Sequence, residues 1–226
     1  MNKLQNRNTT TLKSFFMRTE VSMVLIISAL FLLASFGTEN FLTEYNLTNI
    51  LKQCSIIGVI SIAQTFIIIT GNIDISCGAV VGMSTLMVAM GQAKWGMGIF
   101  GSIVLAIVVA VVCGLFNATL IHNFNVPAFV ATLGSQTILR GLIKVISNGG
   151  TVSGIKRSFT EFASTNFLFL PKLAIVWFLI ALICFLILKY TVFGRNLFVL
   201  GSGEEVAKLN GISIFKTKFG VYAFAG

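Results

Sequence analysis

The segment Gly71-Asn-Ile-Asp-Ile-Ser-Cys-Gly78 interrupts two long apolar stretches of the chain, residues 50–70 and 78–93. It carries the carboxyl group of Asp74, and an ionisable group at bilayer depth is costly to keep out of water. A carboxylate in such a place is a candidate functional residue. The rest of the sequence is arranged around this polar strip.

The spacing of the polar residues predicts an unwound backbone. Asn72, Asp74 and Ser76 alternate with apolar residues, so an extended chain puts all three on one side, whereas a helix turns Asp74 away from the other two. Flanking glycines permit such a segment, which at membrane depth is tolerated only where it lines a cavity or is buried by protein. Two interpretations remain open. The three residues line a pathway, or Asp74 or Ser76 caps the following helix in a tight turn.

Composition indicates a membrane protein. Hydrophobic residues make up 56% of the 226 residues and charged residues only 10%, and the mean hydropathy is +0.93. A soluble domain carries about 25% charged residues, whereas a bilayer needs about 20 apolar residues for each crossing helix. We therefore expect an all-α, polytopic membrane protein with six complete spans and a truncated seventh. The predicted spans are residues 16–36, 50–70, 78–93, 97–121, 126–146, 173–188 and, for the incomplete one, 217–226.

These spans are expected to form one transmembrane domain over residues 1–226 that is incomplete at its C-terminus. Lys and Arg gather before the first span and between the sixth and seventh, and basic loops are retained on the cytoplasmic side. Residues 1–15 and 189–216 are therefore predicted to be cytoplasmic. Arg140 and Lys144 run against this bias because they lie toward the outer end of the fifth span. Orientation accounts for most of the net charge of +9 without a nucleic-acid partner.

Several kinds of site are excluded by what the sequence lacks. The single histidine, His122, stands alone, and the four cysteines are scattered without the close spacing of a zinc site or a redox pair. No Gly-x-x-x-x-Gly-Lys-Ser/Thr segment is present to hold nucleotide phosphates. We expect no metal, no cofactor and no catalytic residue here, so that any ATP is bound by a partner subunit.

A second polar stripe lies within residues 117–141. Pro127 is placed to begin a helix, because its missing N–H costs nothing in the first turn, and small residues beyond it permit close helix packing. Packing alone explains these small residues equally well. The polar residues that could line a sugar-sized route are Thr132, Ser135, Gln136 and Arg140.

A third informative stretch is the basic loop after the sixth predicted span. Glu204 and Glu205 suit a helix N-terminus, where the helix dipole favours acids, and Gly211 after an asparagine is a typical helix stop. The short helix between them presents Val206 and Leu209, three residues apart, on one apolar face. That face could dock into a groove on a soluble partner or rest on lipid headgroups.

Taken together, these stretches resemble the permease subunits of bacterial ABC importers for ribose and related monosaccharides. Residues 71–78 are similar to that family's Gly-Gly-Ile-Asp-Leu-Ser-Val-Gly signature. The resemblance continues through Pro127-Ala-Phe-Val-Ala-Thr-Leu-Gly134 with Leu139-Arg-Gly141, and through Phe193-Gly-Arg195 with residues 204–212. Asn72 and Cys77 depart from the signature, where Gly and Val are commoner.

The resemblance implies a function for each stretch. The segment around Asp74 and the helix of Thr132 would belong to the translocation core, in a bacterial inner-membrane protein that catalyses no bond chemistry. The partners implied are a cytoplasmic ATPase, a periplasmic substrate-binding protein, a second permease copy and membrane lipid. The residues of the helix that would seat on the ATPase are Glu204, Glu205, Val206, Ala207, Leu209 and Gly211.

Two alternatives stay open. Family members are generally longer than this chain, so a non-functional fragment of a permease is one of them. The other is an ion-coupled secondary transporter that uses Asp74 at a broken helix. Such transporters usually show an internal repeat and more intramembrane acids, and neither is found in this sequence.

Overall fold

The computed structural model describes residues 19–168 and 170–226 and is almost entirely helical, as the sequence predicts. The chain divides into two compact units, Met1–Leu51 and Lys52–Gly226, with the boundary inside α3. The helices are α2 (Thr19–Gly37), α3 (Glu44–Ile69), α4 (Cys77–Ala93), α5 (Ile99–His122), α6 (Ala128–Ile146), α7 (Arg157–Ser164), α8 (Lys172–Tyr190), α9 (Val192–Gly201), α10 (Glu204–Leu209) and α11 (Ile214–Ala225). Strands β1 (Asn166–Phe167) and β2 (Leu170–Pro171) pair antiparallel as a small hairpin.

Four of the described helices, α3, α5, α6 and α8, are long and apolar enough to cross a membrane. They match four of the predicted spans, although α3 begins at Glu44 rather than at residue 50. The predicted spans 16–36 and 78–93 correspond to α2 and α4, whose apolar segments, Val21–Gly37 and Cys77–Ala93, are shorter. The count of six complete spans and a truncated seventh is therefore not confirmed. The predicted cytoplasmic tail, residues 1–15, lies outside the described residues.

The first unit contains α2 and the start of α3. Almost all the large apolar side chains of α2 are exposed, a pattern typical of a helix that is surrounded by lipid. The rings of Phe31 and Phe41 meet edge to face at 5.0 Å and fix the turn after the helix.

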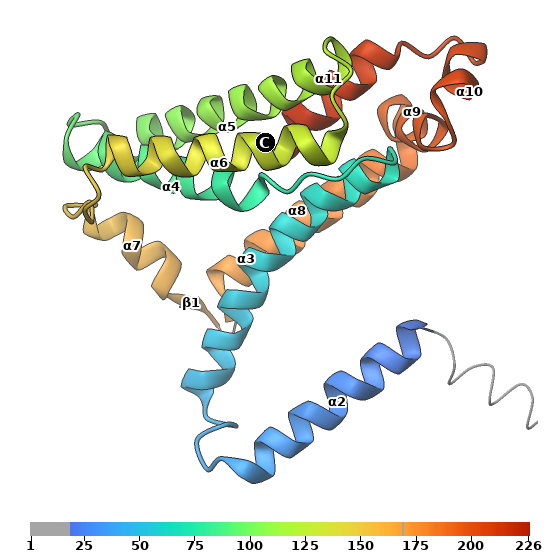
Figure 1. Ribbon diagram of the computed structural model, residues 1–226. Helices are drawn as coiled ribbons and strands as arrows, with labels where there is room; N and C mark the ends of the chain where they lie inside the picture. Colours follow the sequence, from blue (N-terminus) through green and yellow to red (C-terminus); the bar gives the residue numbers. More distant parts are fainter. Residues whose placement is uncertain (1–18, 169) are drawn as a thin grey trace, which may run out of the picture. The chain divides into compact units, whose positions relative to one another are not determined.

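In the second unit, α4, α5 and α6 lie side by side (Figure 1). Small residues such as Ala106 and Ala110 allow these helices to approach closely, as is usual in membranes. Larger side chains fill the remaining space, among them Met83, Met87 and Leu139. These three helices position most of the candidate site.

Helices α5 and α11 approach each other very closely. The Cα of Gly114 lies against the carbonyl group of Tyr222, so that no side chain would fit there without a shift of one helix. At the end of α11, Gly226 lies equally close to the carbonyl group of Ala110. Val221 and Tyr222 are completely buried in a core that also includes residues of α3, α6, α8 and α9.

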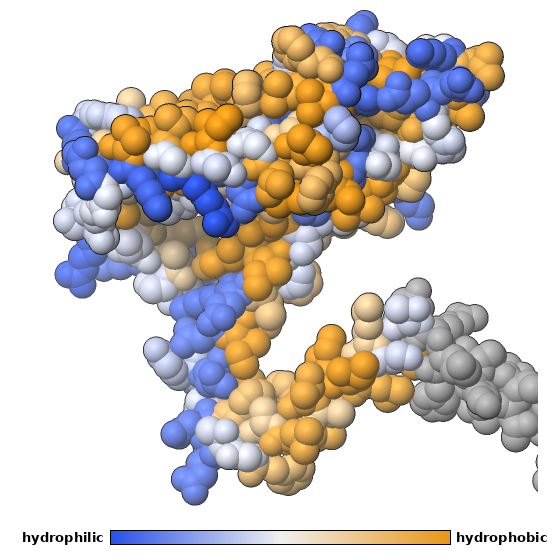
Figure 2. Space-filling view, viewed as in Figure 1, coloured by the Kyte–Doolittle hydropathy of each residue, from blue (hydrophilic) through white to orange (hydrophobic). Residues whose placement is uncertain are grey.

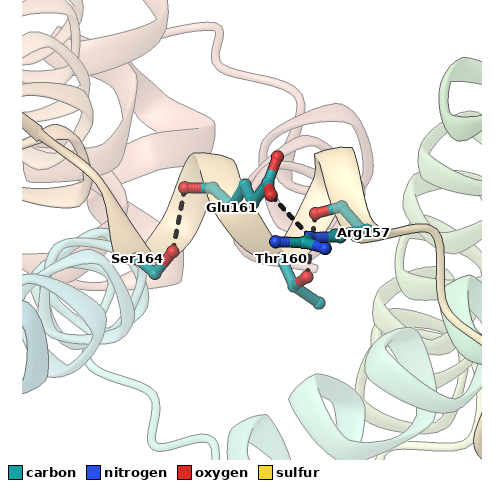
Figure 3. A network of polar contacts seen from close by, with 4 residues as sticks. All are labelled: Arg157, Thr160, Glu161 and Ser164. Atoms are coloured by element: carbon teal, nitrogen blue, oxygen red, sulfur yellow. Dashed lines mark hydrogen bonds and ion pairs between the residues drawn. The ribbon is translucent and has the colours of Figure 1, made fainter.

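The short helix α7 is held in two places. The backbone N–H of Lys156 donates to Gln92 Oε1 of α4 at 2.9 Å, and Lys52 Nζ of α3 donates to the carbonyl of Ser164 at 2.9 Å. Its own polar network is local and exposed, with an ion pair of 2.8 Å between Arg157 and Glu161 (Figure 3). Exposed i,i+4 pairs contribute only about 0.3–0.5 kcal/mol, so this network does little more than stabilise α7.

The surface of the second unit is divided by polarity. Apolar side chains cover broad areas over α5 and α6, whereas hydrophilic residues gather at the helix ends and around α10 (Figure 2). Large exposed apolar side chains also follow α8, including Phe178, Leu182 and Phe185. Such a surface suits contact with lipid along the helices and with water at their ends.

Replacing Gly114 with Ala is expected to destabilise the fold, because the added methyl group would collide with the carbonyl of Tyr222 and push α11 from α5. Overpacking of this kind costs about 1–3 kcal/mol. The matched control is Gly134→Ala in α6, where nothing lies within 4 Å of an added Cβ. That change should stabilise the helix by up to about 1 kcal/mol. Thermal unfolding midpoints in detergent compare the two, and an unchanged midpoint for Gly114→Ala would contradict this packing.

Candidate functional site

The polar strip between α3 and α4 is unwound, as the sequence predicts. Helix α3 ends at Ile69, the chain runs without helical structure to Ser76, and α4 begins at Cys77. Gly71 adopts a φ of 77°, a left-handed conformation that glycine takes without strain. Between two apolar helices, the backbone groups of this segment need partners from within the protein.

Two helices supply such partners. Gln64 Nε2 of α3 donates to the carbonyl oxygen of Asp74 at 2.7 Å. The backbone N–H of Ile75 donates to Thr132 Oγ1 of α6 at 3.1 Å, while the same hydroxyl donates to the carbonyl of Ala128 at 2.8 Å. The segment is therefore tied to α3 on one side and to α6 on the other.

A third tie runs through the side chains of Asp74, Ser76 and Asn117. Asp74 Oδ1 accepts from the backbone N–H of Ser76 at 2.7 Å and from its hydroxyl at 2.6 Å. Ser76 Oγ in turn accepts from Asn117 Nδ2 of α5 at 2.8 Å. Ser76 occupies the N-cap position of α4, but its side chain makes no capping hydrogen bond. Its hydroxyl joins the carboxylate to α5 instead.

The segment borders a cavity of about 440 Å³ formed mainly by α3, α4 and α5. Most of the wall is apolar, with Ile60, Val81 and Ile107 among its members. The polar residues in the lining are Gln64, Asp74, Ser84, Thr85 and Asn117. The cavity thus combines an apolar wall with a small polar area at the unwound segment.

The structure brings together only some of the residues that the sequence singled out. Asp74 lines the cavity, and Ser76 and Thr132 lie completely buried where they hold the segment in place. Asn72 is outside the lining and donates to Thr70 Oγ1 at 3.0 Å. The remaining candidates also lie outside it, with Gln136 half-buried, Arg140 exposed and Ser135 buried.

Sequence reasoning missed Gln64 and Asn117 as members of this site. Each is a polar amide within a strongly apolar helix, and a polar residue at membrane depth is a signal of function. That signal was present in the sequence, but only the folded chain shows that both amides reach the segment of Asp74.

The predicted coupling segment forms α10, which ends at Leu209 before Gly211, as expected for that helix stop. Gly211 has a φ of 71°, which suits the turn after a helix. Ala207 is completely buried against Leu200 of α9 and Ile214 of α11, so it anchors the helix. The other residues of α10 are exposed, namely Glu204, Glu205, Val206, Lys208 and Leu209, the last of them 88% exposed.

Glu204 forms an ion pair with a lysine of α11. Its Oε1 lies 2.6 Å from Nζ of Lys218, a largely buried residue of α11. The hydrogen bond from Lys218, helped by the positive charges of Lys218, Lys208 and His122, lowers the pKa of Glu204 although partial burial opposes this. A lowered carboxyl pKa stabilises the fold above the ordinary pKa of glutamate, and this contribution disappears as the pH falls through the lowered pKa.

The end of α9 lies close to the start of the unwound segment. The Cα of Gly201, the last residue of α9, packs directly against the carbonyl group of Ile69, the last residue of α3. No side chain would fit between them. The backbone before α10 therefore contacts the backbone that leads to Asp74.

The chain is similar to known transport permeases. Residues 46–226 match the family described as "Branched-chain amino acid transport system / permease component". The chain is 34% identical over 199 residues to the ribose import permease protein RbsC of Bacillus subtilis, a match that covers 87% of this chain and 62% of the relative. It is 27% identical over 227 residues to the fructose import permease protein FrcC of Rhizobium meliloti, with 95% and 62% covered.

A third relative is the autoinducer 2 import system permease protein LsrD of Salmonella typhimurium. It is 31% identical over 176 residues, covering 75% of this chain and 53% of the relative. The chain thus spans less than two thirds of the length of these relatives. No solved structure matches the chain significantly.

Replacing Thr132 with Val is expected to loosen the unwound segment, because it leaves the N–H of Ile75 without its acceptor. An unsatisfied buried donor costs about 1–3 kcal/mol. The matched control in α6 is Thr137→Val, since the Thr137 hydroxyl donates only to the carbonyl of Leu133 in its own helix. Hydrogen exchange at Ile75 should accelerate in the first variant alone. Equal exchange in both would show that Thr132 does not hold the segment.

Proposed function

This chain belongs to the family of branched-chain amino acid transport system permease components, and from that membership we propose that it is a permease subunit of an ATP-driven importer. Its cargo is a monosaccharide of the ribose type, since two of the relatives described above carry the names ribose and fructose import permease. The observation that carries the proposal is the unwound segment of Asp74 on the wall of a cavity between apolar helices.

The segment of Asp74 forms part of the translocation pathway. Broken helices in transporters place polar backbone and side chains where a cargo passes, and the cavity of about 440 Å³ is of the size that small-molecule sites have. Ser76 and Thr132 act as positioning residues, because each holds the segment by hydrogen bonds. Asn72, Gln136 and Arg140 contact cargo only if the pathway extends beyond this cavity.

Helix α10 couples the permease to a cytoplasmic ATPase, which binds the ATP. The surface proposed to dock consists of the exposed residues Glu205, Val206 and Leu209. Ala207 and Glu204 hold the helix from within the permease, through the buried cluster and the ion pair with Lys218. Gly211 allows the chain to turn back toward α11.

The remaining partners follow from an importer of this kind. We expect a periplasmic binding protein to deliver cargo, and a second permease copy to complete the pathway. The protein resides in the bacterial inner membrane as a multi-pass protein, with its N-terminus and α10 on the cytoplasmic side. The positions of the basic residues support this orientation.

The proposal is tested with a full-length protein that contains this sequence, reconstituted in liposomes with its ATPase and binding protein. Replacing Leu209 with Asp should lower both ATPase co-purification and sugar uptake by about 10-fold or more, since burying a leucine contributes about 1.5–3 kcal/mol. The matched control is Leu168→Asp, because Leu168 is 80% exposed and belongs to the turn after β1.

Two outcomes would contradict the proposal. Uptake that proceeds without ATP and follows an ion gradient would instead favour a secondary transporter that uses Asp74. Normal ATPase binding by the Leu209→Asp variant would remove α10 from the docking surface.

A further inference from the structure

Asn117 carries a hydrogen-bond acceptor without a partner at the edge of the cavity. The residue is 1% exposed, and among the described residues its Oδ1 has no hydrogen-bond partner. Leaving a buried polar atom unsatisfied costs about 1–3 kcal/mol. An asparagine in the apolar helix α5 therefore needs an additional partner to offset this cost.

The hydrogen-bond network decides which end of the Asn117 amide is unpaired. A serine hydroxyl has one hydrogen to donate, and Ser76 donates it to Asp74 Oδ1 at 2.6 Å. Ser76 Oγ can then only accept from Asn117, so Nδ2 is the end that faces it, at 2.8 Å. If the amide were turned over, Asn117 Oδ1 would face Ser76 Oγ, and both atoms would be acceptors. Oδ1 is thus the end that is left for another donor.

Asp74 offers acceptors close by. Both hydrogen bonds that its carboxylate accepts within the described residues go to Oδ1, which leaves Oδ2 for a further donor. Gln64 Nε2 donates one of its hydrogens to the backbone carbonyl of Asp74, not to the carboxylate. Asn117 and Asp74 are therefore held through Ser76 as two neighbouring acceptors on the wall of one cavity.

The charges of the lining narrow the chemistry of the ligand. The described residues that line the cavity include Asp74 but no lysine, arginine or histidine. A carboxylate or phosphate group would meet a like charge there with no protein cation to balance it, which disfavours an anionic cargo such as a sugar phosphate. A neutral molecule with several hydroxyl groups supplies donors to the acceptors and lays its C–H surface on the apolar wall.

We infer that Asn117 Oδ1 and the Asp74 carboxylate accept hydrogen bonds from hydroxyl groups of a neutral, polyhydroxylated cargo in this cavity, which makes Asn117 a specificity-determining residue of the pathway. This inference rests on the proposed function and adds to it the residues that contact the cargo. Ser76 is a positioning residue in this arrangement, because it acts only through its two neighbours.

The experiment uses the reconstituted full-length transporter with D-ribose, D-fructose and analogues in which one hydroxyl is replaced by fluorine. Fluorine keeps the size of the group but donates no hydrogen bond. For at least one position, the unmodified transporter should import the fluorinated sugar about 10-fold more slowly than the parent, which corresponds to about 1.4 kcal/mol. Rates are measured with saturated binding protein, so that its own selectivity does not enter.

The Asn117→Leu variant should import the parent sugar about 10-fold more slowly than the unmodified transporter. It should also no longer distinguish the parent from that fluorinated analogue. Asn117→Gln, which keeps both the acceptor and the donor of the amide, should retain the distinction. The matched control is Thr119→Val, also in α5 but outside the cavity lining, because the Thr119 hydroxyl donates to the carbonyl of Leu115 in its own helix. That control should leave uptake and selectivity unchanged.

The Ser76→Ala variant separates cargo contact from structural support, since it removes the tie to Asn117 but leaves Oδ1 in place. If Asn117 only supports the segment, Asn117→Leu and Ser76→Ala will slow uptake equally and both will keep the selectivity against fluorine. That result overturns the inference. If Asn117→Leu fails to insert into the membrane, Asn117→Ala takes its place with the same expected loss of selectivity. No ATP-driven uptake of either sugar by the unmodified transporter would instead contradict the proposed function.

Discussion

Unpaired backbone groups are not tolerated inside a hydrocarbon layer, and the non-helical segment from Gly71 to Ser76 is where this constraint acts most strongly. The segment is stable only because side chains from three helices converge on it, with Gln64 from α3, Asn117 from α5 and Thr132 from α6. These ties fix the mutual positions of the helices. The cavity beside Asp74 exists because the segment is held open rather than wound into a helix.

Contacts around α10 connect this helix with the unwound segment and with the cavity. Gly201 packs on the carbonyl of Ile69, directly before the unwound chain. Lys218, paired with Glu204, belongs to α11, which packs closely on α5 through Gly114. A force on α10 would therefore reach two walls of the cavity. One route leads through Gly201 to α3, and the other through Lys218 and α11 to α5. Direct backbone contacts suit the transmission of movement, since the two backbones cannot shift independently of each other.

The sequence was sufficient to predict the long apolar helices, the unwound strip and the short helix α10, because each leaves a local signal. Long apolar stretches predict the helices. Glycines beside alternating polar residues predict the unwound strip. Acidic residues followed by Asn-Gly predict α10. The sequence did not predict which helices pack against one another. Apolar side chains surround most of these helices almost uniformly, so their sequences do not say which face meets which neighbour. For this reason Asn117 was overlooked, while Arg140 proved to be exposed.

A pathway along the unwound segment requires that water reach the cavity beside Asp74. Cys77, the residue after Ser76, lines this cavity, whereas Cys184 of α8 is only 6% exposed and packs in the core. The most direct measurement compares two full-length variants that keep only one of these cysteines, labelled in intact vesicles with a positively charged, membrane-impermeant thiol reagent. The account predicts that Cys77 is labelled, that transported sugar slows its labelling, and that Cys184 is not labelled. Labelling of Cys77 no faster than that of Cys184 would contradict it.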